Sequence, residues 1–296
     1  MNMTPPFFRA PRSILLTSIA LLSPFWIVPA NAGVIWDGGG ADDNWGSGAN
    51  WSPDGPPPVG GTVDLTFDGT TRLTPLNNYT AFDDFHSLFF AATAGQFNVG
   101  GNAIDIFGKI ENYSAVTQTV SLASLGISAG QAGTGEFNPV NGDLVINSAN
   151  VFTNGNALHV YGSNNRTVTF GAGSVISQGG SFAIEQANTV VFQSAHIYTG
   201  DTFVNAGTLA FAAGGSVNGS IIRLGGTAAN SDAATVSLTV TAGGQTLAST
   251  LVVRPSASGT QGVRTIASQN TSGTNTLSGG VFLDADLTTS ATALGG

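Results

Sequence analysis

The sequence contains no cysteine, a single lysine (Lys109) and little charge of either sign. Of its 296 residues, 8 are Lys or Arg and 17 are Asp or Glu, so charged residues make up only 8 %. Without cysteine there are no disulfides and no thiolate chemistry, so the fold must be held by packing and backbone hydrogen bonds. The scarcity of basic residues argues against a nucleic-acid partner, because phosphates require a basic face.

Strand-forming and turn-forming residues take the place of the missing charge. Hydrophobic residues make up 42 % of the chain, with 41 glycines and 18 phenylalanines. This composition is too apolar for a disordered chain. Thr, Ser, Val, Ile and Phe favour strands, whereas Gly and Asn favour the turns between them. The composition therefore predicts an all-β protein.

The N-terminal segment 1–32 has the three-part pattern of a secretory signal peptide. Arg9 and Arg12 precede an apolar run over residues 14–28, and small residues, Ala30 and Ala32, follow. We predict a signal peptide over residues 1–32 that is cleaved after Ala32. The apolar run is shorter than the roughly 20 residues needed to span a bilayer. The mature chain is therefore expected to have no transmembrane segment and a net charge of −11, against −9 for the whole sequence.

A repeat with a period of about 19–24 residues runs through the middle of the chain. Each unit begins with a strand-like segment after turn residues, and two more short strand-like segments follow it. The units begin with DLVIN at Asp143, TVTFG at Thr167, TVVFQ at Thr189 and TLAFA at Thr208. Strands this short bury an apolar side only when successive units stack, with parallel strands about 4.8 Å apart.

This stacking predicts a parallel β-solenoid with three short strands per coil and roughly a dozen coils. Phe170, Phe192 and Phe211 fall at equivalent positions, so we expect them to form one interior column. A β-sandwich is the alternative, since it also uses many short strands.

The predicted organisation has five parts. They are a signal peptide (1–32), a Trp/Gly/Asp/Pro-rich N-terminal cap segment (33–61), irregular first coils (62–142), regular repeats (143–234) and C-terminal coils (235–296). The sequence ends at ATALGG without a polar cap, so we expect the last coil to be incomplete and to stack on further sequence or on a partner.

The stretch YTGDTFVNAGTLAF, Tyr198 to Phe211, resembles the autotransporter-associated β-strand repeat, also called the passenger-associated transport repeat. The matching positions are Tyr198, Thr199, Gly200, Thr202, Val204, Gly207, Thr208 and Leu209. The segments 36–58 and 270–279 are also similar to parts of large exported proteins that carry such repeats. The resemblance implies a right-handed parallel β-helix displayed at or beyond the outer membrane, whose repeats help a passenger fold as it crosses.

Trp36, Trp45 and Trp51 form the most conspicuous cluster, interleaved with Asp and Asn. Their rings could stack on sugars as a glycan-binding platform. Alternatively, they could fold over the first coil as a cap, because the terminal units of stacked repeats need covering. We prefer the cap.

Metal and catalytic sites have weaker support. The GGGADDN stretch suggests a calcium loop through Asp37, Asp42 and Asp43, but the nonapeptide spacing of calcium repeats is absent. The candidate acid–base residues are expected to be thinly spread, without a shared coil position; they are Asp105, Lys109, Glu111, Glu136, Asp143, Glu185 and Asp201. His86, His159 and His196 share no register either, and strand alternation points His159 outward. We therefore expect surface histidines, no metal, no cofactor and no catalytic residues.

These observations favour an exported, non-enzymatic β-solenoid repeat protein that serves as a cell-surface stalk, spacer or adhesin. Its expected partner is an extracellular glycan or another component of a cell surface. The alternatives are a carbohydrate-binding module that uses the Trp cluster and, less favoured, a polysaccharide-degrading β-helix enzyme.

Overall fold

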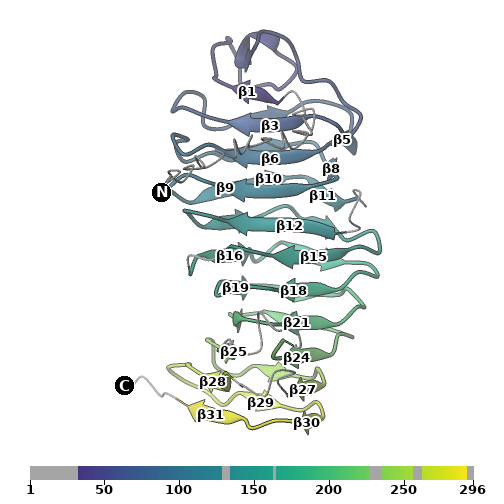
Figure 1. The fold of residues 1–296 in the computed structure, drawn as a ribbon, viewed down its shortest axis with the longest axis vertical. Helices are drawn as coiled ribbons and strands as arrows, with labels where there is room; N and C mark the ends of the chain where they lie inside the picture. The colour runs from purple at the N-terminus through teal and green to yellow at the C-terminus, as the bar shows by residue number, and fades with distance from the viewer. Residues whose placement is uncertain (1–32, 129–133, 163–164, 227–234, 256–261, 292–296) are drawn as a thin grey trace, which may run out of the picture. The chain divides into compact units, whose positions relative to one another are not determined.

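The computed structural model describes residues 33–128, 134–162, 165–226, 235–255 and 262–291. They belong to one compact unit, Asn31–Gly296. The predicted signal peptide, residues 1–32, lies outside the described residues. Within this unit the strands stack as the rungs of a parallel β-solenoid (Figure 1). The predicted fold, with three short strands per coil, is confirmed.

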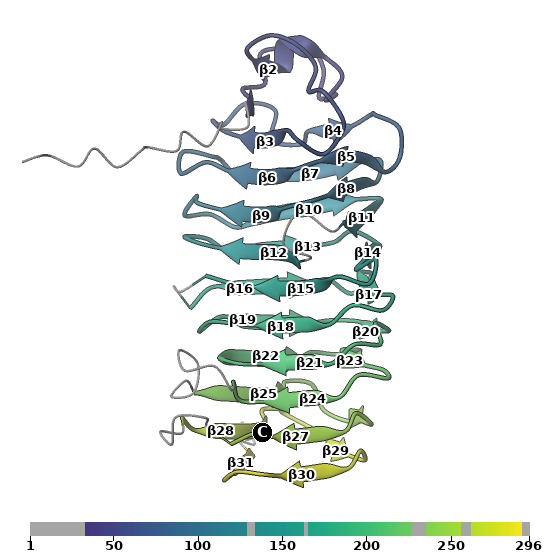
Figure 2. The same cartoon turned by 45° about the vertical axis from the view of Figure 1, so that its right-hand side comes forward.

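Three sheets run along the stack, and Figure 2 brings the third into view at the side. Sheet A has 12 strands: β2 (Trp51–Ser52), β1 (Val34–Trp36), β3 (Asp64–Phe67), β6 (Ser87–Phe90), β9 (Lys109–Asn112), β12 (Thr134–Pro139), β15 (Ala157–Val160), β18 (Phe182–Ile184), β21 (Thr202–Val204), β24 (Ile222–Leu224), β27 (Leu251–Val253) and β30 (Val281–Leu283). Sheet B has 10 strands: β4 (Leu76–Asn77), β7 (Asn98–Gly101), β10 (Gln118–Leu122), β13 (Leu144–Ile146), β16 (Thr167–Phe170), β19 (Thr189–Phe192), β22 (Gly207–Phe211), β25 (Val236–Val240), β28 (Arg264–Ser268) and β31 (Thr288–Ala291).

Sheet C is the shortest and is interrupted. Its five strands are β5 (Asp83–Phe85), β8 (Ile104–Ile106), β11 (Ser124–Ile127), β14 (Asn150–Phe152) and β17 (Val175–Ser177). Two further pairs continue the same side of the coil, namely β20 (Ala195–His196) with β23 (Ser216–Val217), and β26 (Thr246–Leu247) with β29 (Thr276–Leu277). Each coil thus takes one strand from each side in turn.

The strands from β3 to β29 make nine complete coils, and β30 and β31 begin a tenth. The expectation of roughly a dozen coils is therefore wrong. The cap segment adds an incomplete rung: β1 stacks in parallel on β3, and β2 pairs antiparallel with β1 at the end of the sheet. Coil length also varies more than predicted. The coil between the paired Ile184 and Val204 is short, whereas the one between Val253 and Leu283 is half as long again.

Strand alternation decides which side chains enter the core. In β16 and β19 the residues alternate between half-buried and buried, with Val and Phe inside and Thr outside. Phe170 pairs with Phe192, and Phe192 pairs with Phe211, so the three rings form one interior column. Their centres lie 5.5 and 6.0 Å apart, and all three are fully buried. Each such ring contributes roughly 1.5–3 kcal/mol through burial.

Asparagines close the corners of several coils from inside. Asn112 Nδ2 donates to the carbonyl oxygens of Val116 and Asp143, each at 2.9 Å. Asn188 Nδ2 donates to the carbonyl oxygen of Tyr161 at 3.0 Å. A buried carbonyl group needs a donor, and these amides supply it where the chain leaves one sheet for the next.

Within the described ranges, no helix reaches the length and apolar character needed to cross a bilayer.

Candidate functional site

The outward face of sheet A collects a set of side chains that are rare elsewhere in the chain. The sequence has one lysine and three glutamates, Lys109, Glu111, Glu136 and Glu185, and all four lie on this face. The inward neighbours Ile110, Phe137 and Ile184 are fully buried, which fixes the outward direction of these four. We call this surface the charged stripe, and its members are Lys109, Glu111, Tyr113, Glu136, Asn138, His159, Tyr161, Glu185 and Asn205.

The register of the strands lines the charged stripe up in two columns. Glu136 pairs with Lys109 on one side and with His159 on the other, so these three form the first column. The second column starts with Glu111 and its partner Asn138. Its next members are Tyr161 and Glu185, because each follows one residue of the pair Val160 and Ile184. Neighbouring members of a column are therefore separated by about 4.8 Å, the strand spacing.

Glu111 is the buried centre of the upper part of the stripe and is only 5 % exposed. Its oxygens lie 2.9 Å from Lys109 Nζ, 2.8 Å from Asn138 Nδ2 and 2.7 Å from the Tyr113 hydroxyl. Burial opposes the charged form, but hydrogen bonds from Asn138, Lys109 and Tyr113 outweigh it, so the pKa of Glu111 is lowered. The hydrogen bond between Tyr113 and Glu111 raises the pKa of Tyr113 to about 12.

His159 and Glu185 form the lower part of the stripe. His159 Nδ1 lies 2.9 Å from a Glu185 oxygen, and Asn205 Nδ2 donates to the other oxygen at 2.8 Å. The hydrogen bond from His159 is the main cause that lowers the pKa of Glu185, and Asn205 adds to it. Tyr161 stacks on His159 with ring centres 5.6 Å apart and planes 11° from parallel. The imidazole is thus held between a carboxylate and an aromatic ring.

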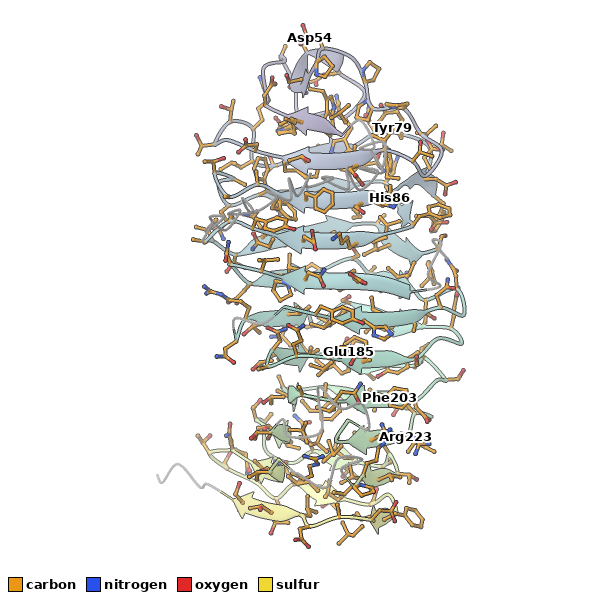
Figure 3. All side chains as sticks on the ribbon, viewed as in Figure 1. Asp54, Tyr79, His86, Glu185, Phe203 and Arg223 are labelled. Atoms are coloured by element: carbon orange, nitrogen blue, oxygen red, sulfur yellow. The ribbon has the colours of Figure 1, made fainter. Side chains whose placement is uncertain are left out.

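Aromatic rings and further ion pairs border the stripe above and below. Lys109 Nζ lies 5.8 Å from the ring centre of Phe89, and the Arg254 guanidinium lies 5.7 Å from that of Phe203. Arg223 Nε lies 2.6 Å from an oxygen of Asp201. Figure 3 labels Glu185, Phe203 and Arg223, which follow one below another along sheet A.

The sequence interpretation of the acid–base candidates is therefore wrong in one respect. Lys109, Glu111, Glu136 and Glu185 are not thinly spread; the coils bring them to one face. Of the remaining candidates, Asp201 lies at the start of β21 on the same sheet, Asp105 belongs to β8 in sheet C, and Asp143 precedes β13 in sheet B. The missing information was the length of the third coil, from Ile110 to its partner Phe137, which exceeds every unit of the regular repeat.

Hydrogen bonds set the ionisation of three groups in the stripe. A carboxyl group that serves as a general acid near neutral pH needs a raised pKa. Glu111 and Glu185 instead have lowered pKa values because lysine, histidine, tyrosine and amide groups donate to them. Tyr113 is held protonated by the adjacent carboxylate. Glu111 and Glu185 therefore stay ionised and Tyr113 stays protonated near neutral pH, as suits hydrogen bonding to a polar ligand.

The three tryptophans of the cap segment, Trp36, Trp45 and Trp51, are all fully buried. Trp51 lies edge-on to both others, with ring centres 5.2 and 6.2 Å away, and its Nε1 donates to the carbonyl oxygen of Trp45 at 2.8 Å. Trp45 also lies 5.6 Å from Phe85 in the first coil. No ring face is open for a sugar to stack on, so these residues cover the end of the core and do not form a glycan platform.

The acidic residues of the cap do not assemble into a calcium site. Asp37 Oδ1 accepts from the backbone N–H of Gly39, and Asp42 accepts from Asn44. Asp43 is turned toward Arg72, at 3.0 Å. Across the described residues, no group of three or more His, Cys, Asp or Glu side chains could hold a metal ion.

The repeat-motif residues build one coil. Val204 and Leu209 face the core and Thr208 faces outward, on β21 and β22. Tyr198 is fully buried, and its hydroxyl lies 2.6 Å from the Thr202 hydroxyl, which lies 2.7 Å from that of Ser220. Thr199 and Gly200 lie at the corner before β21, and Gly207 lies at the next corner, where β22 begins; a Cβ at either glycine would meet backbone atoms of the neighbouring coil within 2.5 Å.

His196 lies inside the core, which corrects the expectation of a surface histidine. It is fully buried on β20, and its Nδ1 accepts a hydrogen bond from the Ile176 N–H at 2.9 Å. Burial lowers the pKa of His196 to about 3, so the ring is neutral. His86 and His159 are half-buried, and His86 Nδ1 lies 2.7 Å from an Asp64 oxygen.

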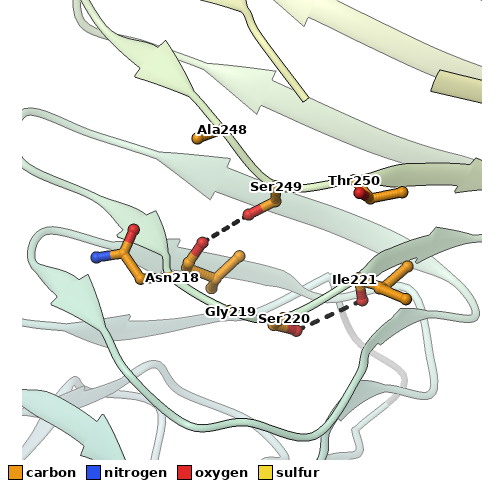
Figure 4. A pocket seen from close by; sticks show the side chains of 8 residues that line it. Asn218, Gly219, Ser220, Ile221, Ala248, Ser249 and Thr250 are labelled. Carbon is orange, nitrogen blue, oxygen red and sulfur yellow. Dashed lines mark hydrogen bonds between the residues drawn. The ribbon is translucent and has the colours of Figure 1, made fainter. Parts of the chain in front are cut away.

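A cavity of about 260 Å³ opens where the third side of the coil is interrupted, between β23 and β26. Residues 217–221 and 248–250 line it (Figure 4). Ser249 Oγ donates to the carbonyl oxygen of Val217 at 2.5 Å across the gap. The lining residues include no charged side chain, so the cavity offers little to fix a ligand.

Comparison with family models, with curated proteins and with solved structures found no match, so the function must be argued from the residues of this chain.

Proposed function

We propose that this chain is an exported β-solenoid, related to proteins with autotransporter-associated repeats, and that it presents the charged stripe as an adhesive surface outside the cell. The observation that carries the proposal is the placement of the only lysine and all three glutamates on one face of one sheet. A purely mechanical stalk has no need to gather its rare charges in this way. Hydrogen bonds within the stripe hold its side chains in place.

Export is supported by the signal pattern of residues 1–32 and by the absence of cysteine, which frees folding from the redox state of the compartment. The test is to express the full chain in a diderm bacterium and to sequence the N-terminus of the protein outside the inner membrane. We expect it to begin at Gly33. Ala32→Glu should block cleavage by placing a charge at the small-residue position. A full-length protein retained in the cytoplasm would contradict export.

Adhesion is tested by display of the exported chain on cells or beads over host or bacterial surfaces. Glu136→Gln and Tyr161→Ala change half-buried members of the stripe without touching the core. Thr189→Val, on the outward face of sheet B, is the matched control. We expect the first two variants to lose adhesion and the control to keep it. Equal adhesion of all three would remove the stripe from the proposal and leave a stalk or spacer.

A polysaccharide-degrading activity is the second candidate, because one amide bridges two carboxylates. Asn138 Nδ2 lies 2.8 Å from a Glu111 oxygen and 3.3 Å from a Glu136 oxygen. Paired carboxylates on one face are the basic requirement of glycoside hydrolysis. The lowered pKa of Glu111 keeps it ionised, so within such a pair Glu111 could serve only as the base or nucleophile. Release of reducing ends from a polysaccharide panel would favour this candidate.

A further inference from the structure

We infer that the charged stripe binds a linear neutral polysaccharide that lies along the stack, across the strands of sheet A. This inference rests on the adhesive function proposed above and names its ligand class. It follows from three properties of the stripe: its charge balance, its repeat distance and its aromatic rings.

The charge balance of the stripe disfavours polyanions as ligands. Lys109 is paired with Glu111 at 2.9 Å, and His159 with Glu185 at 2.9 Å. The remaining carboxylate is Glu136, which lies 3.3 Å from the amide of Asn138. Among the stripe's members, the basic side chains are thus already engaged by carboxylates, and three carboxylates face a single lysine. A phosphate, sulfate or uronate would have to displace one of these carboxylates in order to bind.

The repeat distance favours a polymer over a small molecule. From β9 to β21 the stripe crosses five successive strands, which is about 19 Å at the strand spacing. Each crossing supplies a hydrogen-bonding group that faces outward: Lys109, Glu136, His159 and Tyr161, Glu185 and Asn205. A chain of sugars presents hydroxyl groups repeatedly along its length, and these can both donate to carboxylates and accept from amine or amide groups.

Aromatic rings supply the apolar surface that sugar binding needs. Tyr113 is 39 % exposed, and Phe89, Tyr161 and Phe203 are half-buried on the same face. A few placed polar groups among aromatic side chains is the usual composition of a ligand site. Tyr161 is pre-positioned by its stacking on His159 at 5.6 Å, so little side-chain freedom would be lost on binding.

The test uses the exported chain in native gels that contain hydroxyethyl cellulose, xylan, mannan or dextran, with polygalacturonate and heparin as anionic probes. We expect at least one neutral polymer to retard the protein and neither anionic polymer to do so. Oligosaccharides from that polymer should bind more tightly with length until they span about 19 Å. Tyr161→Ala should weaken binding about tenfold, as the loss of one aromatic anchor does.

The controls separate the site from the fold. Tyr161→Phe keeps the ring and should retain most of the affinity, while Thr189→Val on sheet B should retain all of it. Circular dichroism of each variant verifies that the solenoid is intact. Retardation by no neutral polymer, or equal retardation of Tyr161→Ala and wild type, would overturn the inference. So would a preference for the anionic polymers.

Failure of the neutral-polysaccharide inference can be distinguished from failure of the proposed adhesive function. If stripe variants abolish adhesion but no neutral polymer binds, the adhesive surface stands and the ligand class is wrong. If a neutral polymer binds at the stripe but displayed cells do not adhere, the ligand class stands and adhesion is wrong. If the polymer is cleaved during the assay, the enzymatic candidate would replace the binding proposal.

Discussion

Protonation of His196 should make the solenoid unfold more easily in mildly acidic solution. The imidazole is fully buried, with its ring centre 4.0 Å from that of Phe192 and 5.7 Å from that of Phe170. Because Nδ1 accepts the N–H of Ile176, the proton of the neutral ring sits on Nε2. Nε2 has no hydrogen-bonding partner within the described part of the chain. A second proton would place a charge in an aromatic core and remove the acceptor.

The magnitude follows from the difference in pKa between the folded and unfolded chain. Burial lowers the pKa of His196 to about 3, against 6.5 for an ordinary histidine. Between these values the unfolded chain binds more protons, so the stability of the fold decreases as the pH falls below 6.5. The loss amounts to roughly 1.4 kcal/mol for each pH unit, or about 2 kcal/mol between pH 7 and pH 5.

Urea unfolding followed by circular dichroism at pH 7 and pH 5 measures this loss. His196→Asn is the decisive variant, because its Oδ1 can accept the Ile176 N–H but does not titrate. We expect it to be less stable than wild type at pH 7, since a smaller side chain leaves a cavity, and to lose about 2 kcal/mol less on acidification. His86→Asn, at a half-buried histidine, controls for the loss of a histidine as such. Equal losses for wild type and His196→Asn would refute the reasoning.

Three further outcomes follow from the packing and the stripe. Phe192→Ala should destabilise the fold by about 3–5 kcal/mol in urea unfolding, because it leaves a cavity in the phenylalanine column. Gly207→Ala should lower the melting temperature far more than Gly155→Ala: both glycines have positive φ, 76° and 82°, but only at Gly207 would the new Cβ meet backbone atoms. Tyr113→Phe removes one hydrogen bond that holds the pKa of Glu111 low. Ionised Glu111 should therefore stabilise the variant less than it stabilises wild type above the pKa that Glu111 has in the unfolded chain. The free energy of unfolding of the variant should fall less than that of wild type when the pH is lowered from 5 to 3.

The regular coils could be predicted strand by strand because two independent patterns agree there. In β16 and β19, buried Val and Phe alternate with outward Thr and Val, and Gly or Asn marks most corners between Thr167 and Phe211. The alternation gives the buried face, and the similar spacing from Thr167 to Thr189 and from Thr189 to Thr208 gives the register. Phe170, Phe192 and Phe211 fall into one column because both patterns fix them.

The charged stripe could not be predicted because it depends on register alone. Outward positions carry no alternation constraint of their own, and the coil that joins Lys109 to Glu136 is longer than any unit of the repeat. His196 was missed for a related reason. In the sequence HIYTG the apolar Ile197 invites an inward assignment, but it is 53 % exposed, and the flanking His196 and Tyr198 are inside. The buried hydroxyl chain from Tyr198 to Ser220 decides that choice, and no local pattern reveals it.

The same stacking that builds the core also creates the charged stripe. A solenoid fixes every second residue of a strand by packing and leaves the others free, so outward columns can carry chemistry without disturbing the fold. In this chain the outward positions of β16 and β19 in sheet B hold Thr and Val, and those of sheet C include Asp84 and Asp105, whereas those of sheet A hold the glutamates and the lysine. A shift of the register by a single position would turn Glu136 inward and Phe137 outward, so the core and the stripe must be lost or kept together. The third coil is long, yet it keeps this register, with Glu136 beside Lys109 and Phe137 beside Ile110. Both the inward and the outward side chains of β12 therefore depend on the length of that coil.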